Sequence, residues 1–156
     1  MEQLSAIVLA AGQGTRMKSK LPKVLHQVCG IPMIQQVVRI IKAAGCENCI
    51  AVTGFKEELV RTSLGDTVHQ TEQLGTGHAV MQALPLIKEN MDGYVLVICG
   101  DTPLIKTETI KKLISICIKN QAAATVLTAQ LANPFGYGRV IRDSTGNMRC
   151  IVEQKD

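Results

Sequence analysis

The sequence predicts an α/β domain with a mainly parallel sheet and helices on both faces. Short apolar segments alternate along the chain with segments whose apolar residues recur at helical spacing. This alternation is typical of strand–helix–strand units, in which the strands run parallel and are buried on both faces. The length of 156 residues fits one compact unit.

Each predicted element has a local signal. Ile34, Val37, Val38 and Ile41 make one helical stripe, and Gly45 follows it where a C-terminal glycine is common. The predicted strands are the segments 5–10, 49–53, 67–70, 94–99 and 123–129, with a hairpin of 138–141 and 148–152 around a turn at 144–147. The other predicted helices are 56–64, one that Thr76 caps and one that starts at Thr107.

The composition excludes several classes of protein. With 46% hydrophobic and 19% charged residues, the chain is not intrinsically disordered. Its 3% aromatic content and lack of tryptophan disfavour stacking on single-stranded nucleic acid, so we expect no nucleic-acid partner. No apolar run approaches the roughly 18 residues of a membrane span, and no basic residue precedes the first apolar run. We therefore expect no membrane association and a cytoplasmic location.

The positive charge of the chain is local. The net charge is +4, but the segment 3–46 has six basic residues and no acidic one. Four of these six lie between Arg16 and Lys23. This density favours binding of a concentrated anion such as polyphosphate, although a solvated basic loop is the alternative.

The six cysteines are predicted to be reduced core residues, because most of them lie beside aliphatic residues and no secretory signal is present. Cys46 and Cys49 form one CxxC motif, without the second pair of ligands that a zinc site needs. Nothing further in the sequence marks this pair as redox active.

The first motif is the glycine-containing loop after the strand 5–10. Gly12 and Gly14 allow backbone N–H groups to approach a phosphate, and Arg16 and Lys23 add positive charge. The segment lacks the Gly-Lys-Ser/Thr of a P-loop and the third glycine of a dinucleotide fingerprint. A plain glycine turn between strand and helix is the structural alternative.

The second motif is Asp101, which follows Gly100 at the end of the strand 94–99. A carboxylate at this place is a natural Mg²⁺ ligand, since Mg²⁺ completes its shell with water and substrate phosphate. Asp101 capping the following turn is an equally good interpretation of the residue alone.

The third motif runs from Gln70 through Gly75 to His78. The Gln70 amide offers a donor and an acceptor, which match a uracil edge, and Gly75 leaves its backbone accessible to a base. For His78, a packed or surface histidine is favoured over a catalytic one. Because ligands bind at the carboxyl ends of parallel strands, we expect all three motifs to converge at one edge of the sheet.

Taken together, these motifs resemble the N-acetylglucosamine-1-phosphate uridyltransferases, the amino-terminal part of bacterial bifunctional enzymes. The matching segments are LAAGQGTRM at 9–17, PKVL at 22–25, Gln70 with QLGTGHA at 73–79, GDTPL at 100–104, GYGR at 136–139 and VEQKD at 152–156. The resemblance implies a Rossmann-like nucleotidyltransferase fold and Mg²⁺ as the cofactor. It implies that UTP and N-acetylglucosamine 1-phosphate give UDP-N-acetylglucosamine and pyrophosphate, for peptidoglycan and lipopolysaccharide precursors.

The resemblance also implies residue roles. Arg16, Lys23 and Asp101 are the catalytic candidates, Asp101 is the metal ligand, and Gly138 and Glu153 contact the sugar. The implied nucleotide-binding residues are Leu9, Ala10, Ala11, Gly12, Gly14, Lys23, Gln70, Gly75, Thr76, Cys99, Gly100 and Asp101. The family often has Tyr-Gly where this chain has Cys99-Gly100, so one aromatic neighbour of the site is missing.

The family's domain continues beyond the segment that matches 152–156, to asparagines that contact sugar and metal. We therefore expect residues 1–156 to hold only the N-terminal portion of the uridyltransferase domain, incomplete at the C-terminus. The expected behaviour is nucleotide binding with little turnover, and self-association through the sheet edge at 148–152. The alternatives are another sugar-1-phosphate nucleotidyltransferase and a non-catalytic nucleotide-binding or interaction module.

Overall fold

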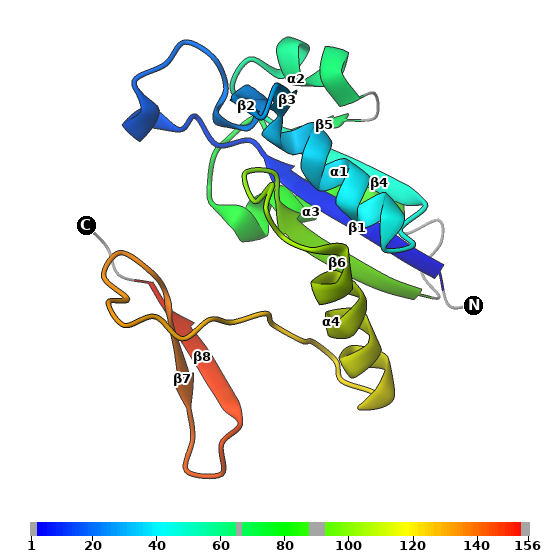
Figure 1. The fold of residues 1–156 in the computed structure, drawn as a ribbon, viewed down its shortest axis with the longest axis vertical. Coiled ribbons are helices and arrows are strands. Elements are labelled where there is room, and N and C mark those ends of the chain that lie inside the picture. Colours follow the sequence, from blue (N-terminus) through cyan, green and yellow to red (C-terminus); the bar gives the residue numbers. More distant parts are fainter. Residues whose placement is uncertain (1–2, 65–66, 88–92, 154–156) are drawn as a thin grey trace.

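A parallel sheet forms the centre of the structure, a computed structural model that describes residues 3–64, 67–87 and 93–153 (Figure 1). Its strand order is β5-β4-β1-β6, with every pairing parallel. The strands are β1 (Gln3–Ala10), β4 (Asn48–Thr53), β5 (Thr67–His69) and β6 (Gly93–Cys99). The predicted α/β class with a mainly parallel sheet is confirmed.

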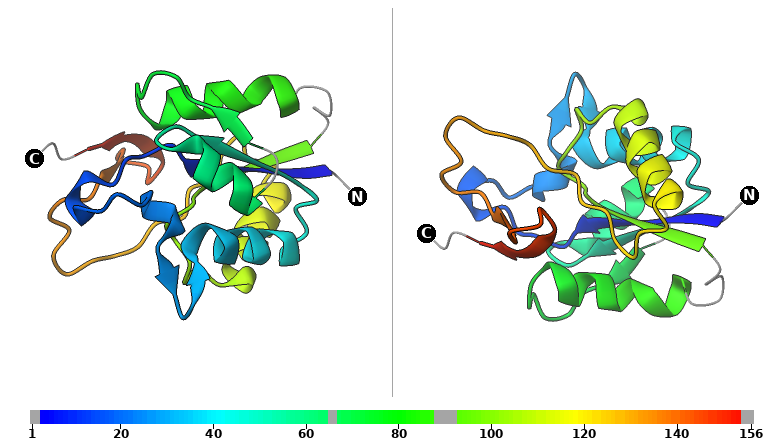
Figure 2. Two further views of the ribbon diagram at one scale, coloured as in Figure 1. Left: turned by 90° about the horizontal axis from the view of Figure 1, so that it is seen from above. Right: turned by 90° about the horizontal axis from the view of Figure 1, so that it is seen from below.

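Helices cover both faces of this sheet. The helices are α1 (Met33–Ala43), α2 (Glu57–Leu64), α3 (Thr76–Ile87) and α4 (Thr107–Lys119). Figure 2 shows α3 on one side of the sheet and α1 with α4 on the other. The short elements are 3₁₀ turns η1 (Thr15–Met17) and η2 (Lys23–Leu25), and strands β2 (Gln27–Val28), β3 (Ile31–Pro32), β7 (Arg139–Arg142) and β8 (Met148–Val152).

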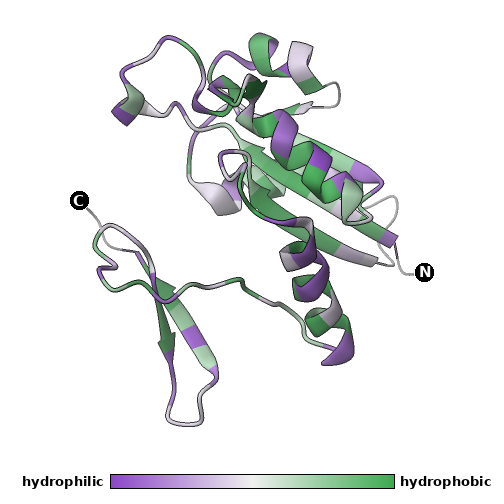
Figure 3. Cartoon of the chain, in the orientation of Figure 1, coloured by the Kyte–Doolittle hydropathy of each residue, from purple (hydrophilic) through white to green (hydrophobic). Residues whose placement is uncertain are grey.

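The alternation of side chains along β1 creates two cores. Ala6 and Val8 belong to the larger core, together with buried residues of α1, α2 and α4. Ile7 points to the other face and packs with Ala83 and other residues of α3. Figure 3 shows this arrangement as hydrophobic strands in the centre and hydrophilic outward faces on α1 and α4. Burial on both faces explains why β1 is apolar at consecutive positions.

The predicted stop signal at Gly45 ends α1 as expected. Gly45 has a φ of 105°, in the left-handed region that favours glycine. The N–H of Cys46 bonds to the carbonyl of Ile41, and the N–H of Gly45 to that of Lys42. This pair of bonds is the Schellman motif, which satisfies the last carbonyls of a helix.

The predicted strand at 123–129 is wrong. These residues have no regular secondary structure, and most of them are exposed. β6 is the edge strand of the sheet, and a cavity of about 760 Å³ lies between β6, α4 and residues 122–127. Because a strand requires a hydrogen-bonded neighbour, an apolar segment held away from the open edge stays irregular.

The predicted hairpin is confirmed, since β7 and β8 pair antiparallel around a turn. Asp143 Oδ1 accepts hydrogen bonds from the backbone N–H groups of Thr145 and Asn147, which closes that turn. The hairpin stands apart from the central sheet (Figure 1), and every residue of β8 is exposed. Self-association through this edge stays a prediction. None of the helices in the described parts of the chain has the length and apolar character to span a membrane.

Candidate functional site

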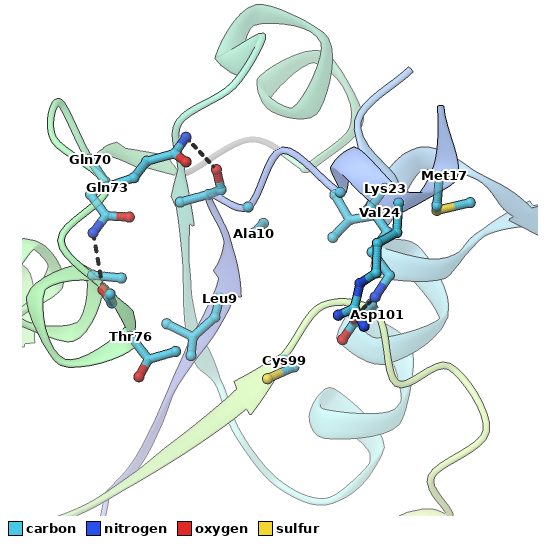
Figure 4. A pocket seen from close by; sticks show the side chains of 16 residues that line it. Leu9, Ala10, Met17, Lys23, Val24, Gln70, Gln73, Thr76, Cys99 and Asp101 are labelled. Atoms are coloured by element: carbon cyan, nitrogen blue, oxygen red, sulfur yellow. Dashed lines mark hydrogen bonds and ion pairs between the residues drawn. The ribbon is translucent and has the colours of Figure 1, made fainter. Parts of the chain in front are cut away.

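A cavity of about 490 Å³ lies at the carboxyl ends of β1 and β6 (Figure 4). The three predicted motifs meet there, as the parallel topology requires. The predicted site residues that line it are Leu9, Ala10, Ala11, Gly12, Gly14, Arg16, Lys23, Gln70, Gly75, Thr76, Cys99 and Asp101. Segments more than 60 residues apart in the sequence therefore share one site.

The glycines of the loop after β1 have different roles. A Cβ at Gly12 would meet no atom within 4 Å, so its backbone is open to a ligand. Gly14 has a φ of 64°, and a Cβ there would lie 2.7 Å from the Cβ of Lys23. Gly14 thus lets the loop turn tightly against the Lys23 side chain, a packing role that the sequence did not reveal.

Lys23 and Asp101 form an ion pair inside the cavity. Lys23 Nζ donates a hydrogen bond to Asp101 Oδ2 at 2.5 Å. The side chains are 40% and 29% exposed, so solvent and ligands reach both groups. Lys23 begins η2 directly after the buried Pro22, and Asp101 directly follows the end of β6. With Arg16 also lining the cavity, basic groups outnumber acidic ones there.

The chemistry of Asp101 fits a divalent metal with few protein ligands. Its carboxylate already holds one cationic group, the ammonium of Lys23. In the described parts of the chain, no cluster of three or more His, Cys, Asp or Glu residues is placed to hold a metal. Mg²⁺ is commonly bound by one or two carboxylates, with water and substrate phosphates as the remaining ligands. A metal on Asp101 would thus depend on a phosphorylated ligand.

Cys99 lines the same cavity as a protonated thiol. Burial raises the pKa of Cys99, Asp101 raises it further, and Lys23 partly opposes both effects. A thiol with a raised pKa is a poor nucleophile and a poor ligand for Mg²⁺, which prefers oxygen. Cys99 therefore contributes shape rather than charge.

The CxxC pair lies away from this cavity. Burial is the main reason that the pKa of Cys46 is raised to about 11, and the charge of Cys49 adds to this effect. Burial also raises the pKa of Cys49, against the opposing effect of Lys42. Both residues are free thiols, and Cys46 belongs to the larger core. Protonated thiols of this kind act as small apolar residues.

Two glutamine amides hold the opposite wall of the cavity. Gln70 is only 3% exposed, and its Nε2 donates to the carbonyl of Gly75 at 3.2 Å. Gln73 Nε2 donates to the carbonyl of Ala11 at 3.1 Å, which ties this wall to the loop after β1. Gln73 lines the cavity and was missed as a site residue, although the third motif contains it.

The start of α3 differs from the prediction that Thr76 caps it. Thr76 is the first helical residue, so Gly75 occupies the capping position. The carbonyl of Gly75 accepts the N–H of Ala79 at 3.1 Å. Gly75 has a φ of 101°, which only glycine adopts without strain. The chain turns into the helix at a residue whose exposed backbone lines the cavity.

The remaining predicted site residues do not line the cavity. Gly100 packs behind it, since a Cβ there would lie 3.2 Å from the carbonyl oxygen of Leu9 and 3.3 Å from Val24. Gly138 lies against Ile151 of the hairpin, and Glu153 follows β8 as an exposed residue. Met17, Val24 and Ala79 also line the cavity. Each lies inside a segment that matches the family, but none of them was predicted to be a site residue.

Replacing Gly14 by alanine is expected to weaken triphosphate binding about tenfold or more, because the new Cβ displaces Lys23 and a charge-assisted hydrogen bond contributes about 1.5–3 kcal/mol. Gly30→Ala is the matched control, since Gly30 has a φ of 78° and its Cβ would meet nothing within 4 Å. Calorimetric titration with UTP checks both variants. Equal losses of affinity would mean that backbone strain, not the position of Lys23, is responsible.

The fold and the cavity define a nucleotidyltransferase-like α/β domain. A glycine loop, basic side chains and a carboxylate meet at the carboxyl edge of a parallel sheet. The chain belongs to the family of MobA-like NTP transferase domains, whose family model matches residues 6–151.

Curated relatives match almost the whole chain but only part of their own length. The bifunctional protein GlmU of Geobacillus sp. (strain WCH70) is 55% identical over 97% of this chain and 33% of the relative. GlmU of Streptococcus gordonii is 56% identical over the same shares. The chain thus spans about a third of the length of these relatives.

Solved structures share the fold at low sequence identity. A nucleotidyl transferase from Methanothermobacter thermautotroptrophicus, Mth528, has a TM-score of 0.62 at 23% identity, covering 72% of this chain and 57% of that one. Rv0371c from Mycobacterium tuberculosis H37Rv has a TM-score of 0.61 at 21% identity, covering 74% and 60%. A complex of Rv0371c with manganese has a TM-score of 0.57 at 20% identity, covering 73% and 59%.

Proposed function

We propose that this chain carries the uridyl-transfer site that makes UDP-N-acetylglucosamine and pyrophosphate from UTP and N-acetylglucosamine 1-phosphate. This proposal rests on the cavity in which the Lys23–Asp101 pair faces Gln70 and Gly75. The identity of 55–56% to two GlmU proteins supports this choice among nucleotidyltransferases. The product would serve cell-envelope precursors, and we propose a cytoplasmic location for its synthesis.

The basic residues would bind and neutralise the triphosphate. Arg16 and Lys23 line the same cavity as Gly12, whose backbone is open to a ligand. The phosphate of the amino sugar would attack the α-phosphorus of UTP, forming one P–O bond while the bond to the β-phosphate oxygen breaks and pyrophosphate leaves. Because the attacking phosphate is already ionised, the reaction needs positioning and charge neutralisation rather than a general base.

Asp101 would hold Mg²⁺ beside these phosphates. When bound, the metal supplies Lewis-acid stabilisation of the charge on the phosphoryl oxygens. A metal on Asp101 would compete with the Lys23 ammonium for the carboxylate, and the displaced ammonium would be free to contact the triphosphate. The Lys23 ammonium would thus move from the Asp101 carboxylate to the triphosphate when UTP enters the cavity. The manganese complex of Rv0371c concerns another protein, and it accords with a divalent metal in this fold.

The uracil would lie against Gln70 and Gly75, on the wall opposite Asp101. Figure 4 shows the Gln70 amide oxygen turned toward the cavity. The exposed backbone of Gly75 leaves room for a flat base beside it.

The sugar half of the site would involve Gly138 and Glu153. Both belong to the hairpin region, which stands apart from the central sheet and contributes nothing to the lining of the cavity. Positioning of two reactants contributes up to about 7–11 kcal/mol to catalysis. We therefore expect the 156 residues to bind UTP but to release pyrophosphate slowly.

Calorimetric titration with UTP and with ATP, each with Mg²⁺, tests the proposed nucleotide. We expect tighter binding of UTP, because the wall of Gln70 and Gly75 suits the smaller base with its N3–H donor. Equal affinity for the two nucleotides would contradict the uridine assignment. Failure of both to bind would contradict nucleotide transfer altogether.

A further inference from the structure

A chain of side-chain contacts leads from the cavity wall into α3. Gln70 Nε2 lies 3.2 Å from the carbonyl oxygen of Gly75 and 3.0 Å from Nδ1 of His78. On the far side of the imidazole, the side-chain amide of Gln82 lies 3.1 Å from Nε2 of His78. His78 is half-buried and is not itself a lining residue of the cavity.

The Gly75 carbonyl fixes which end of the Gln70 amide faces inward. A carbonyl oxygen only accepts hydrogen bonds, so the group that faces Gly75 must be the amide NH₂. The same nitrogen also faces His78 Nδ1, which must therefore accept its second hydrogen. Both hydrogens of the Gln70 amide are then used inside the protein.

This arrangement determines the tautomer of His78. A neutral imidazole carries its hydrogen on one ring nitrogen, and an accepting Nδ1 leaves that hydrogen on Nε2. The Gln82 amide stands at the right distance, 3.1 Å, to accept it once its oxygen is turned toward the ring. The contacts among Gly75, Gln70 and His78 then each have a donor and an acceptor. The Gln82 amide gives up its 3.4 Å hydrogen bond to the His78 carbonyl oxygen in exchange for the bond with the ring.

We propose that His78 is a positioning residue that makes the base-facing group of the cavity an acceptor only. With both amide hydrogens held by Gly75 and His78, Gln70 presents Oε1 alone to the nucleobase (Figure 4). Uracil offers a hydrogen at N3, whereas cytosine offers a lone pair there. The network therefore favours UTP over CTP. This inference rests on the proposed uridine nucleotide and adds the residue that sets the choice between pyrimidines.

The substitution test compares two variants of His78. His78→Phe keeps an aromatic ring but removes the acceptor at Nδ1, so only the Gly75 carbonyl still holds the Gln70 amide nitrogen. With one of its two inward hydrogen bonds lost, the amide turns more freely, and its NH₂ group then also pairs with cytosine. We expect the ratio of UTP affinity to CTP affinity to fall about fivefold, as for the loss of one neutral hydrogen bond. His78→Asn, whose side-chain oxygen takes the place of Nδ1, should restore most of the ratio. His69→Phe is the control, because His69 lies on β5, pairs with Glu57 of α2 and is outside the cavity lining.

A spectroscopic measurement tests the tautomer without any nucleotide. In long-range ¹H–¹⁵N correlation spectra of the ¹⁵N-labelled protein at neutral pH, we expect Nε2 of His78 to carry the hydrogen and Nδ1 to carry none. A purely structural role for His78 would change the melting temperature of the variants but not their UTP-to-CTP ratio.

The outcomes separate this inference from the proposed function. A hydrogen on Nδ1, an unchanged UTP-to-CTP ratio in His78→Phe, or equal wild-type affinity for UTP and CTP would each overturn the role of His78. The first two of these results leave the proposed uridine site standing. Failure of the wild type to bind UTP at all would overturn the proposed function and the inference with it.

Discussion

Asp101→Asn is expected to lower the rate of pyrophosphate release about 100- to 1,000-fold, because it removes the charged ligand of a metal that contributes several kcal/mol at the reacting phosphate. The amide retains the size of the carboxylate, so the fold and the metal-independent binding of UTP should change little. Release of pyrophosphate with saturating UTP and N-acetylglucosamine 1-phosphate, at limiting Mg²⁺, measures the effect in a version of the chain extended through the rest of the uridyltransferase domain.

Binding of Mn²⁺ in the presence of UTP gives a second measurement for Asp101→Asn that does not depend on turnover. The matched control is Glu108→Gln, which neutralises a carboxylate in the first turn of α4, outside the cavity lining. A wild-type rate for Asp101→Asn at limiting Mg²⁺ would rule out a metal role for Asp101.

Lys23→Ala is expected to have two opposite effects. It should weaken UTP binding about 10- to 100-fold, because a charge-assisted contact with phosphate contributes about 1.5–3 kcal/mol. In the absence of nucleotide it should strengthen Mn²⁺ binding, because the ammonium no longer neutralises Asp101. Titration with UTP measures the first effect. Titration with Mn²⁺, in which the signals of free and bound metal are compared, measures the second.

The stability of Lys23→Ala should stay near that of the wild type, since a pair as exposed as Lys23 and Asp101 contributes about 0–1 kcal/mol to folding. Lys20→Ala is the control, because Lys20 belongs to the same basic segment but does not line the cavity. Unfolding of Lys23→Ala, or unchanged affinity for both ligands, would favour a structural role for Lys23.

The central sheet could be predicted because burial on both faces leaves a strong local signal. β1 and β4 have consecutive apolar residues, and α1 has a stripe of buried residues and a glycine stop. The segment 123–129 has the same apolar character. A strand forms only where a neighbouring strand can pair with it, and the residues of this segment do not show whether such a neighbour is present. Local composition cannot report whether the adjacent edge of β6 is within reach.

The convergence of the three motifs could also be predicted, because parallel strands end at a common edge. The direct pairing of Lys23 with Asp101 could not, since 78 positions separate the two residues. The sequence likewise assigned the Gln70 amide a donor and an acceptor for the base. In the structure the nitrogen of that amide faces both the Gly75 carbonyl and Nδ1 of His78, a consequence of packing that no residue type reveals.

A crystal structure of the chain with UTP and Mn²⁺ tests the central claim most directly, because the anomalous signal of manganese locates the metal independently of the nucleotide. We predict the metal on the Asp101 carboxylate, the triphosphate against Lys23 and the loop at Gly12, and the uracil at the Gln70 oxygen. Lys23 should have left Asp101 for the phosphates. Manganese away from Asp101, or an intact Lys23–Asp101 pair beside bound UTP, would contradict the account.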